Sequence, residues 1–173
     1  RSDYPDTKDT GKGSAPVVDM GATEYTILFV DDNAAGAQNG TSWADAFTDL
    51  QDALDRVVPG VQIRVAQGTY HPTKVLTFIC DFFAPPITSP AFTLTDYAEL
   101  YGGFAPEAGV VTLPQRDWKK YETIASGDIG EPGNDEDNAN TLFYIANSNT
   151  AAVLDGFVIT KGHGRTRTIP FPP

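Results

Sequence analysis

Apolar and polar residues alternate along several segments of this chain, which is the pattern of half-buried β-strands. In the segment 61–66, VQIRVA, aliphatic residues take every second position, and Gln62 and Arg64 separate them. One face of such a strand is buried and the other meets water. The β-branched and aromatic run YTILFV at 25–30 predicts another strand. We expect further strands within the segments 91–104, 122–128, 141–147 and 151–162.

One segment has the spacing of an amphipathic helix instead. Between residues 45 and 58, four apolar side chains recur at intervals of three or four residues: Phe47, Leu50, Leu54 and Val57. This spacing places them on a single face of a helix. The Pro-Gly pair at 59–60 is typical of a helix end. We therefore predict one helix near 45–58.

The expected strands are short, and Gly-, Asn- and Asp-rich turns separate them at irregular intervals of about 20 to 30 residues. After residue 68 no segment between them has a helical period, and the two-residue turns of hairpins are scarce. This pattern favours an all-β solenoid, in which each coil buries its apolar row by stacking on its neighbours. The helix near 45–58 would cap the first coil and cover its unpaired strand edges.

Several motifs that occur in a fixed order carry a family resemblance. They are FVDDNAAGAQNGTSWADAFTDLQDAL, IRVAQGTYHPT, FTLTDYAELYGGF, QRDW followed by TIASGDIG, DNANT and AVLDGFVITKGHG. Over residues 27–164, the chain resembles the N-terminal part of bacterial right-handed parallel β-helix surface proteins of the pectin-lyase-like, choice-of-anchor type. The resemblance implies secretion, an extracellular or cell-surface setting and a structural or adhesive role, and it implies no particular reaction.

These observations predict an all-β fold, a short right-handed parallel β-helix with one N-terminal capping α-helix. The β-helix is expected to cover 26–164 and a proline-rich tail to cover 165–173. The segment 1–25 is expected to be extended, as a donor strand or as the tail of a preceding module, because SAPVVDMGATEY resembles the closing segment of the same family. A chain that begins at Arg1 is expected to be a piece of a longer protein.

The charge balance limits the partners of the chain. The 173 residues include 23 acidic and 12 basic side chains, which gives a net charge of −11. A field of this sign repels nucleic-acid phosphates and anionic lipids and attracts cations such as calcium. No apolar run approaches the ~18 residues that a membrane span needs. We therefore expect neither nucleic-acid binding nor membrane insertion.

The single cysteine excludes an internal disulfide framework. Cys80 lies in the apolar run TFICDF, which predicts a buried and inert thiol. A catalytic thiol would need a histidine partner, and the only two histidines, His71 and His163, lie in no recognisable context.

The acidic loop at 126–140, SGDIGEPGNDEDNAN, is the most site-like stretch. We take Asp128, Asp135 and Asp137 as candidate calcium ligands, because calcium prefers six to eight carboxylate and carbonyl oxygens. The spacing does not match an EF-hand, and a solvated acidic turn is the alternative. In the sequence VDDN at 30–33, a weaker candidate, the polar residues more plausibly shape a turn.

The function that the sequence favours is a non-catalytic extracellular structural or adhesive module that self-assembles into oligomers or filaments. The apolar side chains of the last expected coil would be costly to hydrate. They are Val153, Leu154, Phe157, Val158 and Ile159. The edge of that coil would accept a strand from another copy, such as the segment 1–25. The expected partners are further copies of the chain, other surface proteins or glycans.

The alternative is a polysaccharide-degrading or carbohydrate-binding β-helix domain. An enzyme of this kind needs a carboxylate pair, or a calcium ion with a basic residue, on one exposed face. The candidates are Asp96, Glu99, Asp155, Arg116 and Lys161, which form no convincing cluster in the sequence. Glycan stacking would use Tyr70, Tyr97, Tyr101 or Tyr121, although such aromatic residues are more often stacked in the core or on the sheet.

Overall fold

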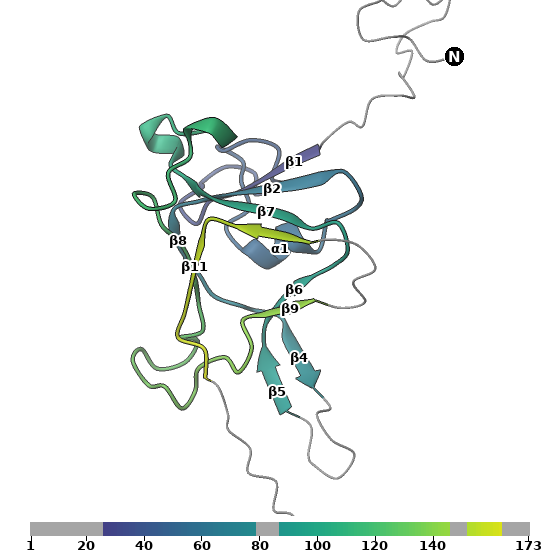
Figure 1. The fold of residues 1–173 in the computed structure, drawn as a ribbon, viewed down its shortest axis with the longest axis vertical. Coiled ribbons are helices and arrows are strands. Elements are labelled where there is room, and N and C mark those ends of the chain that lie inside the picture. The colour runs from purple at the N-terminus through teal and green to yellow at the C-terminus, as the bar shows by residue number, and fades with distance from the viewer. Residues whose placement is uncertain (1–25, 79–86, 146–151, 164–173) are drawn as a thin grey trace, which may run out of the picture.

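Short strands in four small sheets form the framework of the protein (Figure 1). The computed structural model describes residues 26–78, 87–145 and 152–163. The strands are β1 (Thr26–Val30), β2 (Val61–Ala66), β3 (Gly68–Tyr70), β4 (Val75–Phe78), β5 (Ile87–Pro90), β6 (Phe92–Leu94), β7 (Glu99–Phe104), β8 (Thr123–Ser126), β9 (Phe143–Ile145), β10 (Val153–Asp155) and β11 (Phe157–Thr160). The helical elements are α1 (Leu50–Leu54) and the 3₁₀ turns η1 (Pro106–Ala108) and η2 (Leu113–Gln115).

Three of the sheets are parallel. The largest has the strand order β1-β2-β7-β10, the second has the order β11-β8-β3, and the third pairs β6 with β9. The fourth sheet is the antiparallel hairpin β4-β5. In Figure 1, β8 and β11 turn away from the direction of β2 and β7, so that the two main sheets meet at an angle.

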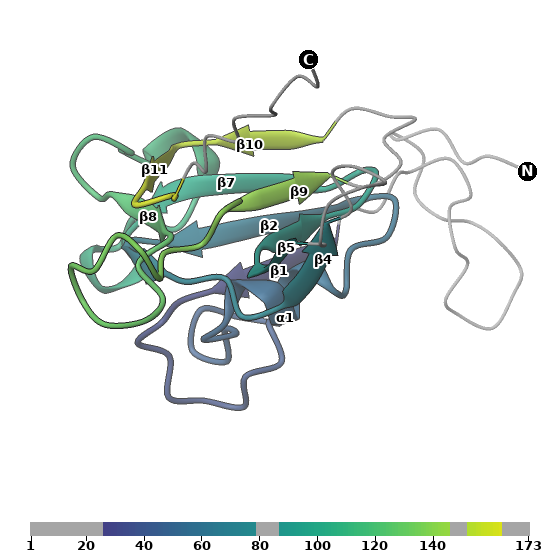
Figure 2. The ribbon, with the colours of Figure 1, turned by 90° about the horizontal axis from the view of Figure 1, so that it is seen from below.

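The parallel strands stack in successive layers. We call β6, β7 and β8 the middle layer, and β9, β10 and β11, which pair with them in the same order, the end layer. On the other side of the middle layer, β2 pairs with β7 and β3 pairs with β8. Figure 2 shows this order, from α1 and β1 through β2 and β7 to β10.

The prediction of a short right-handed parallel β-helix is wrong. The described strands lie in four separate sheets that do not close into one solenoid, and one sheet is antiparallel. The reason lies in the connections, which have very different lengths. A single residue links β2 to β3, whereas residues 31–60 separate β1 from β2 and residues 105–122 separate β7 from β8. The spacing of the short strands in the sequence does not show which connecting segments run outside the stack of parallel strands.

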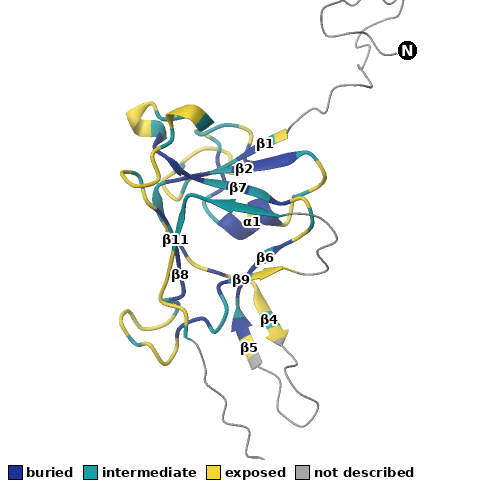
Figure 3. Cartoon of the chain, in the orientation of Figure 1, coloured by how far each residue is buried: buried dark blue, intermediate teal, exposed yellow. Residues whose placement is uncertain are grey.

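The core lies between the sheets and α1 (Figure 3). Leu28, Ile63 and Leu100 occupy one register row across β1, β2 and β7 and are 9%, 0% and 0% exposed. Full burial of such an aliphatic side chain is worth about 1.5–3 kcal/mol, so this row is a main source of stability. Leu50 and Leu54 of α1 close the same core from the β1 side.

The helix is shorter than the pattern at 45–58 predicts. Phe47 forms a parallel bridge with Val30: its N–H donates to the carbonyl of Phe29 at 2.9 Å, and its carbonyl accepts from Asp31 at 2.8 Å. This extended backbone delays the helix until Asp49, whose carboxylate accepts from the N–H of Gln51 at 2.7 Å as the N-cap. Tertiary pairing therefore overrides the helical period of the segment.

Candidate functional site

In the acidic loop at 126–140, carboxylates accept hydrogen bonds from other residues of the same loop. Asp128 accepts from the N–H of Gly133 at 3.3 Å and lies 3.3 Å from the ammonium of Lys161. Asp137 accepts from the N–H of Glu131 at 2.8 Å and from the amide of Asn134 at 3.1 Å. These bonds account for the density of acidic residues as a set of turn-forming contacts.

The three candidate calcium ligands are not brought together. Each has its own partners, and Asp135 accepts from the amide of Asn138 at 3.3 Å. No three acidic, histidine or cysteine side chains converge on a common point within the described residues. The Lys161 ammonium beside Asp128 would also repel a cation. Calcium binding stays a prediction, which a melting experiment with added calcium and with chelator would test.

Four of the five residues considered for an enzyme make polar contacts with neighbouring segments, whereas the buried Oδ1 of Asp96 has no hydrogen-bond partner among the described residues. The Arg116 guanidinium lies 2.7 Å from the Asp155 carboxylate and 5.3 Å above the ring centroid of Tyr101. Glu99 accepts from Gln62 at 3.5 Å on the outer side of the same sheet. The structure therefore joins Arg116 and Asp155 as an ion pair across neighbouring segments. Cys80 lies outside the described residues.

The four tyrosines considered for glycan stacking have different surroundings. Tyr70 is 3% exposed, and its hydroxyl donates to the carbonyl of Ala66 at 3.2 Å, which makes it a core residue. Tyr101 is half-buried beside Arg116, and Tyr121 is half-buried. Tyr97 is 45% exposed in the turn before β7, so it has the most accessible ring of the four.

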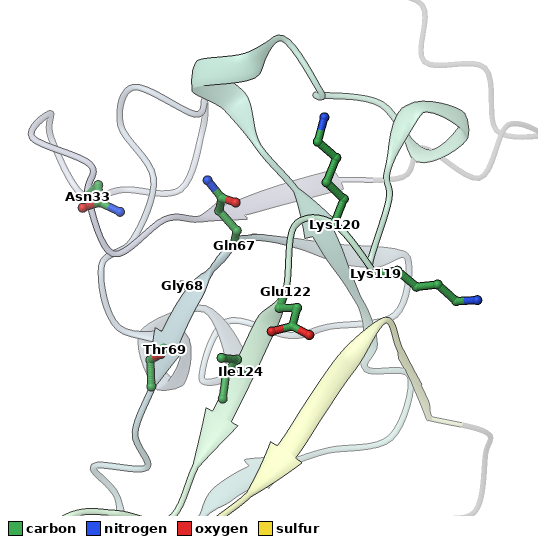
Figure 4. Close-up of a pocket in the computed structure, with 8 residues that line it drawn as sticks. All are labelled: Asn33, Gln67, Gly68, Thr69, Lys119, Lys120, Glu122 and Ile124. Atoms are coloured by element: carbon green, nitrogen blue, oxygen red, sulfur yellow. The ribbon is translucent and has the colours of Figure 1, made fainter. Parts of the chain in front are cut away.

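A groove of about 580 Å³ lies beside β3 and β8 (Figure 4). Its volume falls in the range of about 300–1,000 Å³ that is usual for small-molecule sites. Figure 4 shows Glu122 and Gln67 near its centre and both lysine side chains extending away from Glu122. The lining is Asn33, Gln67, Gly68, Thr69, Lys119, Lys120, Glu122 and Ile124. Hydrogen-bonding side chains therefore dominate this groove.

Asp32 lies against one wall of the groove. A Cβ atom on Gly68 would come within 2.6 Å of the Asp32 carboxylate, so a larger residue there would have to displace that side chain. Burial raises the pKa of Asp32, and the N–H of Thr69 that bonds to the carboxylate acts in the opposite direction. Burial, together with the negative charge of Asp32, also raises the pKa of the Tyr70 hydroxyl.

The end layer leaves inward-facing apolar side chains uncovered. Ile145 is 49% exposed, although its register partner Leu94 in the middle layer is 2% exposed. Ile159 is 55% exposed, although its partner Ala125 is fully buried. Three further side chains in the same position are only partly buried. Together these residues form what we call the open face: Phe143, Ile145, Leu154, Phe157 and Ile159.

Strand edges without a ladder partner among the described residues lie beside the open face. Among the described residues, β9 pairs only with β6, β10 only with β7 and β11 only with β8. The opposite edge of each strand therefore has no ladder partner in the described chain. Apolar side chains beside such a strand edge are an arrangement that can accept another polypeptide.

No protein-family model, curated protein or solved structure matches this chain. Nothing in these comparisons identifies a pectin-lyase-like protein, so the functional argument rests on the geometry. No described helix combines the length and the apolar character that a bilayer crossing requires.

Part of this site was predicted from the sequence. The apolar residues expected in the last coil include Leu154, Phe157 and Ile159, which belong to the open face. Phe143 and Ile145 were not predicted, because their position depends on the pairing of β9 with β6. The groove had no sequence signal, since it combines residues from three distant segments.

Proposed function

We propose that this chain is a non-catalytic structural or adhesive module that works outside the cell and docks polypeptide on its open face. The contrast in exposure between the end layer and the middle layer carries the proposal. Side chains that occupy equivalent register positions are buried in one layer and exposed in the next. The fold thus presents partly exposed apolar side chains, which a docked polypeptide would cover.

Covering the open face with a partner would lower the free energy of the protein. Apolar surface removed from water contributes about 25 cal/mol per Å², so a few hundred Å² favour a docked partner by several kcal/mol before the entropic cost of association. The edges of β10 and β11 that have no ladder partner among the described residues would orient a docked strand, because main-chain hydrogen bonds fix how it aligns. Self-association is the simplest form of such docking.

The extracellular setting rests on the motif resemblance, and the non-catalytic role on the use of charged side chains. The two ion pairs that involve Arg116 and Lys161 hold segments together: Arg116 with Asp155, and Lys161 with Asp128. Basic residues that hold segments in this way serve packing rather than turnover. A structural role agrees with this use.

The proposal is tested by sedimentation velocity over a range of chain concentrations. We expect the sedimentation coefficient to rise with concentration and Ile159→Asp to abolish the rise, because a charge would have to be buried. Ile159 is already 55% exposed, so the folded monomer should tolerate the change. Val58→Asp is the matched control, since Val58 is 58% exposed in the connection between α1 and β2. A chain that stays monomeric throughout would contradict docking on the open face.

Glycan binding is the second candidate, and the groove favours it. Amide, hydroxyl and carboxylate groups line the groove, and they match sugar hydroxyls, which both donate and accept hydrogen bonds. Trp118 is 48% exposed, and because the Lys119 ammonium lies 5.0 Å from its ring centroid, a sugar would have to stack on the other face of the ring. Titration with neutral and uronic-acid oligosaccharides should change tryptophan fluorescence, and Trp118→Ala should weaken the binding. An unchanged spectrum with every oligosaccharide would count against this candidate.

A further inference from the structure

The groove beside β3 and β8 is surrounded by more negative than positive charge. Three charged side chains line it: Lys119, Lys120 and Glu122. Four further carboxylates are hydrogen-bonded to lining residues: Asp31, Asp32, Glu107 and Asp117. Among the described residues, the charged groups that line the groove or bond to its lining are therefore mostly carboxylates. This local balance has the same sign as the net charge of the chain, −11.

Glu122 is a carboxylate that remains available to a ligand. Its main chain is held by the ladder, because its carbonyl accepts from the Gly68 N–H at 3.1 Å. Its side chain is exposed and lies near the centre of the groove (Figure 4). Among the described residues, the carboxylate has no hydrogen-bond or ion-pair partner. A ligand in the groove would therefore meet an unpaired carboxylate.

The two lysines of the groove are directed elsewhere. The Lys119 ammonium lies 5.0 Å from the ring centroid of Trp118, and the Lys120 ammonium lies 4.8 Å from the ring centroid of Tyr121. These are cation–π contacts, and both side chains extend away from Glu122 (Figure 4). At the centre of the groove, Glu122 would therefore attract a cationic group and repel an anionic one.

The lining favours a saccharide over a peptide. Of the described residues that line the groove, Ile124 is the one with an aliphatic side chain, so a peptide would find little apolar surface. The outer edge of β3 is also closed to an added strand at Thr69, whose N–H already bonds to Asp32. Amide and hydroxyl side chains such as those of Asn33 and Thr69 match sugar hydroxyls.

We infer that the groove binds an amino sugar, a saccharide with a free ammonium group, and that Glu122 pairs with this group. The inference rests on the glycan-binding candidate proposed above and specifies the class of glycan. A neutral sugar lacks the ion pair, and a uronic acid meets Glu122 as a like charge. Glu122 thus determines which glycan the groove prefers.

Calorimetric titration of the full chain tests the inference. The probes are glucosamine oligosaccharides, the same oligosaccharides with every amine acetylated, and uronic-acid oligosaccharides, at a pH that keeps the amines protonated. We expect the glucosamine oligosaccharide to bind about two- to fivefold more tightly than its acetylated counterpart, as one exposed ion pair provides. The uronic-acid oligosaccharide should bind least tightly.

Two variants distinguish the role of Glu122 from that of overall charge. Glu122→Gln removes a charge at an exposed position, so the chain should still fold. It should bring the ratio of the two affinities close to one and leave the affinity for the acetylated oligosaccharide unchanged. Glu136→Gln is the matched control, because it removes the same charge from an exposed residue outside the groove lining. It should keep the ratio of the wild type.

The outcomes separate this inference from glycan binding itself. Equal affinity for the glucosamine and acetylated oligosaccharides, tightest binding of the uronic acid, or a preference that persists in Glu122→Gln would overturn the amino-sugar inference while glycan binding stands. A chain that binds none of the oligosaccharides would overturn both. Binding of a lysine-rich peptide without binding of glucosamine oligosaccharides would show that the groove takes a peptide and would also overturn the inference.

Discussion

At the scale of single residues, Thr123 joins the two main sheets. It is fully buried at the start of β8. Its hydroxyl accepts from the N–H of Gly103 at 2.9 Å and donates to the carbonyl of Ala66 at 3.1 Å. One side chain therefore satisfies main-chain groups at the ends of both β2 and β7. A buried main-chain group left without such a partner would be destabilising.

We predict that Thr123→Val lowers the free energy of unfolding by about 1–3 kcal/mol, because it leaves the Gly103 N–H buried without a partner. Valine keeps the shape of threonine, so packing changes little. Thr123→Ser retains the hydroxyl and should recover most of the loss caused by the missing hydrogen bonds. Urea denaturation of the three proteins measures the difference. Equal stability of the valine variant and the wild type would show that these bonds contribute little.

We expect Asp32 to make stability depend on pH. Its pKa in the folded protein lies above the ordinary value of 3.8, since burial disfavours the charged form. The stability it contributes is fully present below 3.8 and is lost as the pH rises through the raised folded pKa. Asp32→Asn removes this ionisation, and its amide oxygen can still accept from the Thr69 N–H.

We therefore predict that Asp32→Asn gains stability relative to the wild type as the pH is raised from about 3 to about 6. Melting temperatures measured across this interval provide the comparison. Asp52→Asn on the exposed side of α1 serves as the control for a lost carboxylate. A constant difference between Asp32→Asn and the wild type at every pH would contradict the effect of burial on Asp32.

At the scale of elements, Gln51 joins α1 to β6 by hydrogen bonds. Its side chain is 4% exposed, accepts from the N–H of Thr93 at 3.0 Å and donates to the Thr93 hydroxyl at 2.8 Å. It also donates to Asp55 at the end of the helix at 2.8 Å. A helix of five residues is too short to be stable by itself, so these bonds and the buried leucines hold it in place.

Gln51→Met should therefore destabilise the protein by about 1–3 kcal/mol, since it keeps the length of the side chain and leaves the Thr93 N–H without its acceptor. The double variant Gln51→Met, Thr93→Val should lose less than the sum of the two single changes, because the residues share one network. Chemical denaturation of the four proteins completes this cycle. Strict additivity would show that the two side chains act independently.

Most strand positions could be predicted from sequence, but their pairing could not. The alternation at 61–66 coincides with β2, whereas the expected strand at 91–104 is divided into β6 and β7. The division follows from a turn in which Tyr97 adopts a left-handed φ of 68°, a conformation uncommon for tyrosine and therefore not suggested by the sequence. The hairpin β4-β5 was missed altogether.

For the candidate site too, the sequence predicted residue positions but not their tertiary contacts. The apolar run at 151–162 indicated part of the open face, since exposed Ile159 follows the alternation of a strand. The calcium hypothesis came from composition, which counts carboxylates but does not show that Asp137 already bonds to the main chain of its own loop. Local pattern predicts which residues are apolar or acidic, and only the tertiary register decides what covers them.

At the scale of the whole molecule, net charge opposes the self-association that we propose for the open face. Two chains of charge −11 repel each other, and dissolved salt screens this repulsion beyond about 10 Å at 0.1 M. We predict that raising the salt concentration from about 0.02 to about 0.2 M increases the fraction of associated chains. Light scattering at fixed chain concentration measures the effect. Dissociation by salt would indicate an interface held by ion pairs instead of apolar contact.

The layered order also determines where the native molecule opens first. In the part of the chain that the structure describes, β2 and β7 have strand neighbours on both sides, whereas β10 and β11 each have a single strand neighbour. Brief local unfolding should therefore begin at the end layer and reach β7 only in rarer, larger openings. Amide hydrogen–deuterium exchange should be fastest in β10 and β11 and slowest in β2 and β7. A bound second copy should slow exchange at β10 most. A peptide-resolved exchange map at low and high chain concentration would therefore show whether local unfolding begins at the end layer.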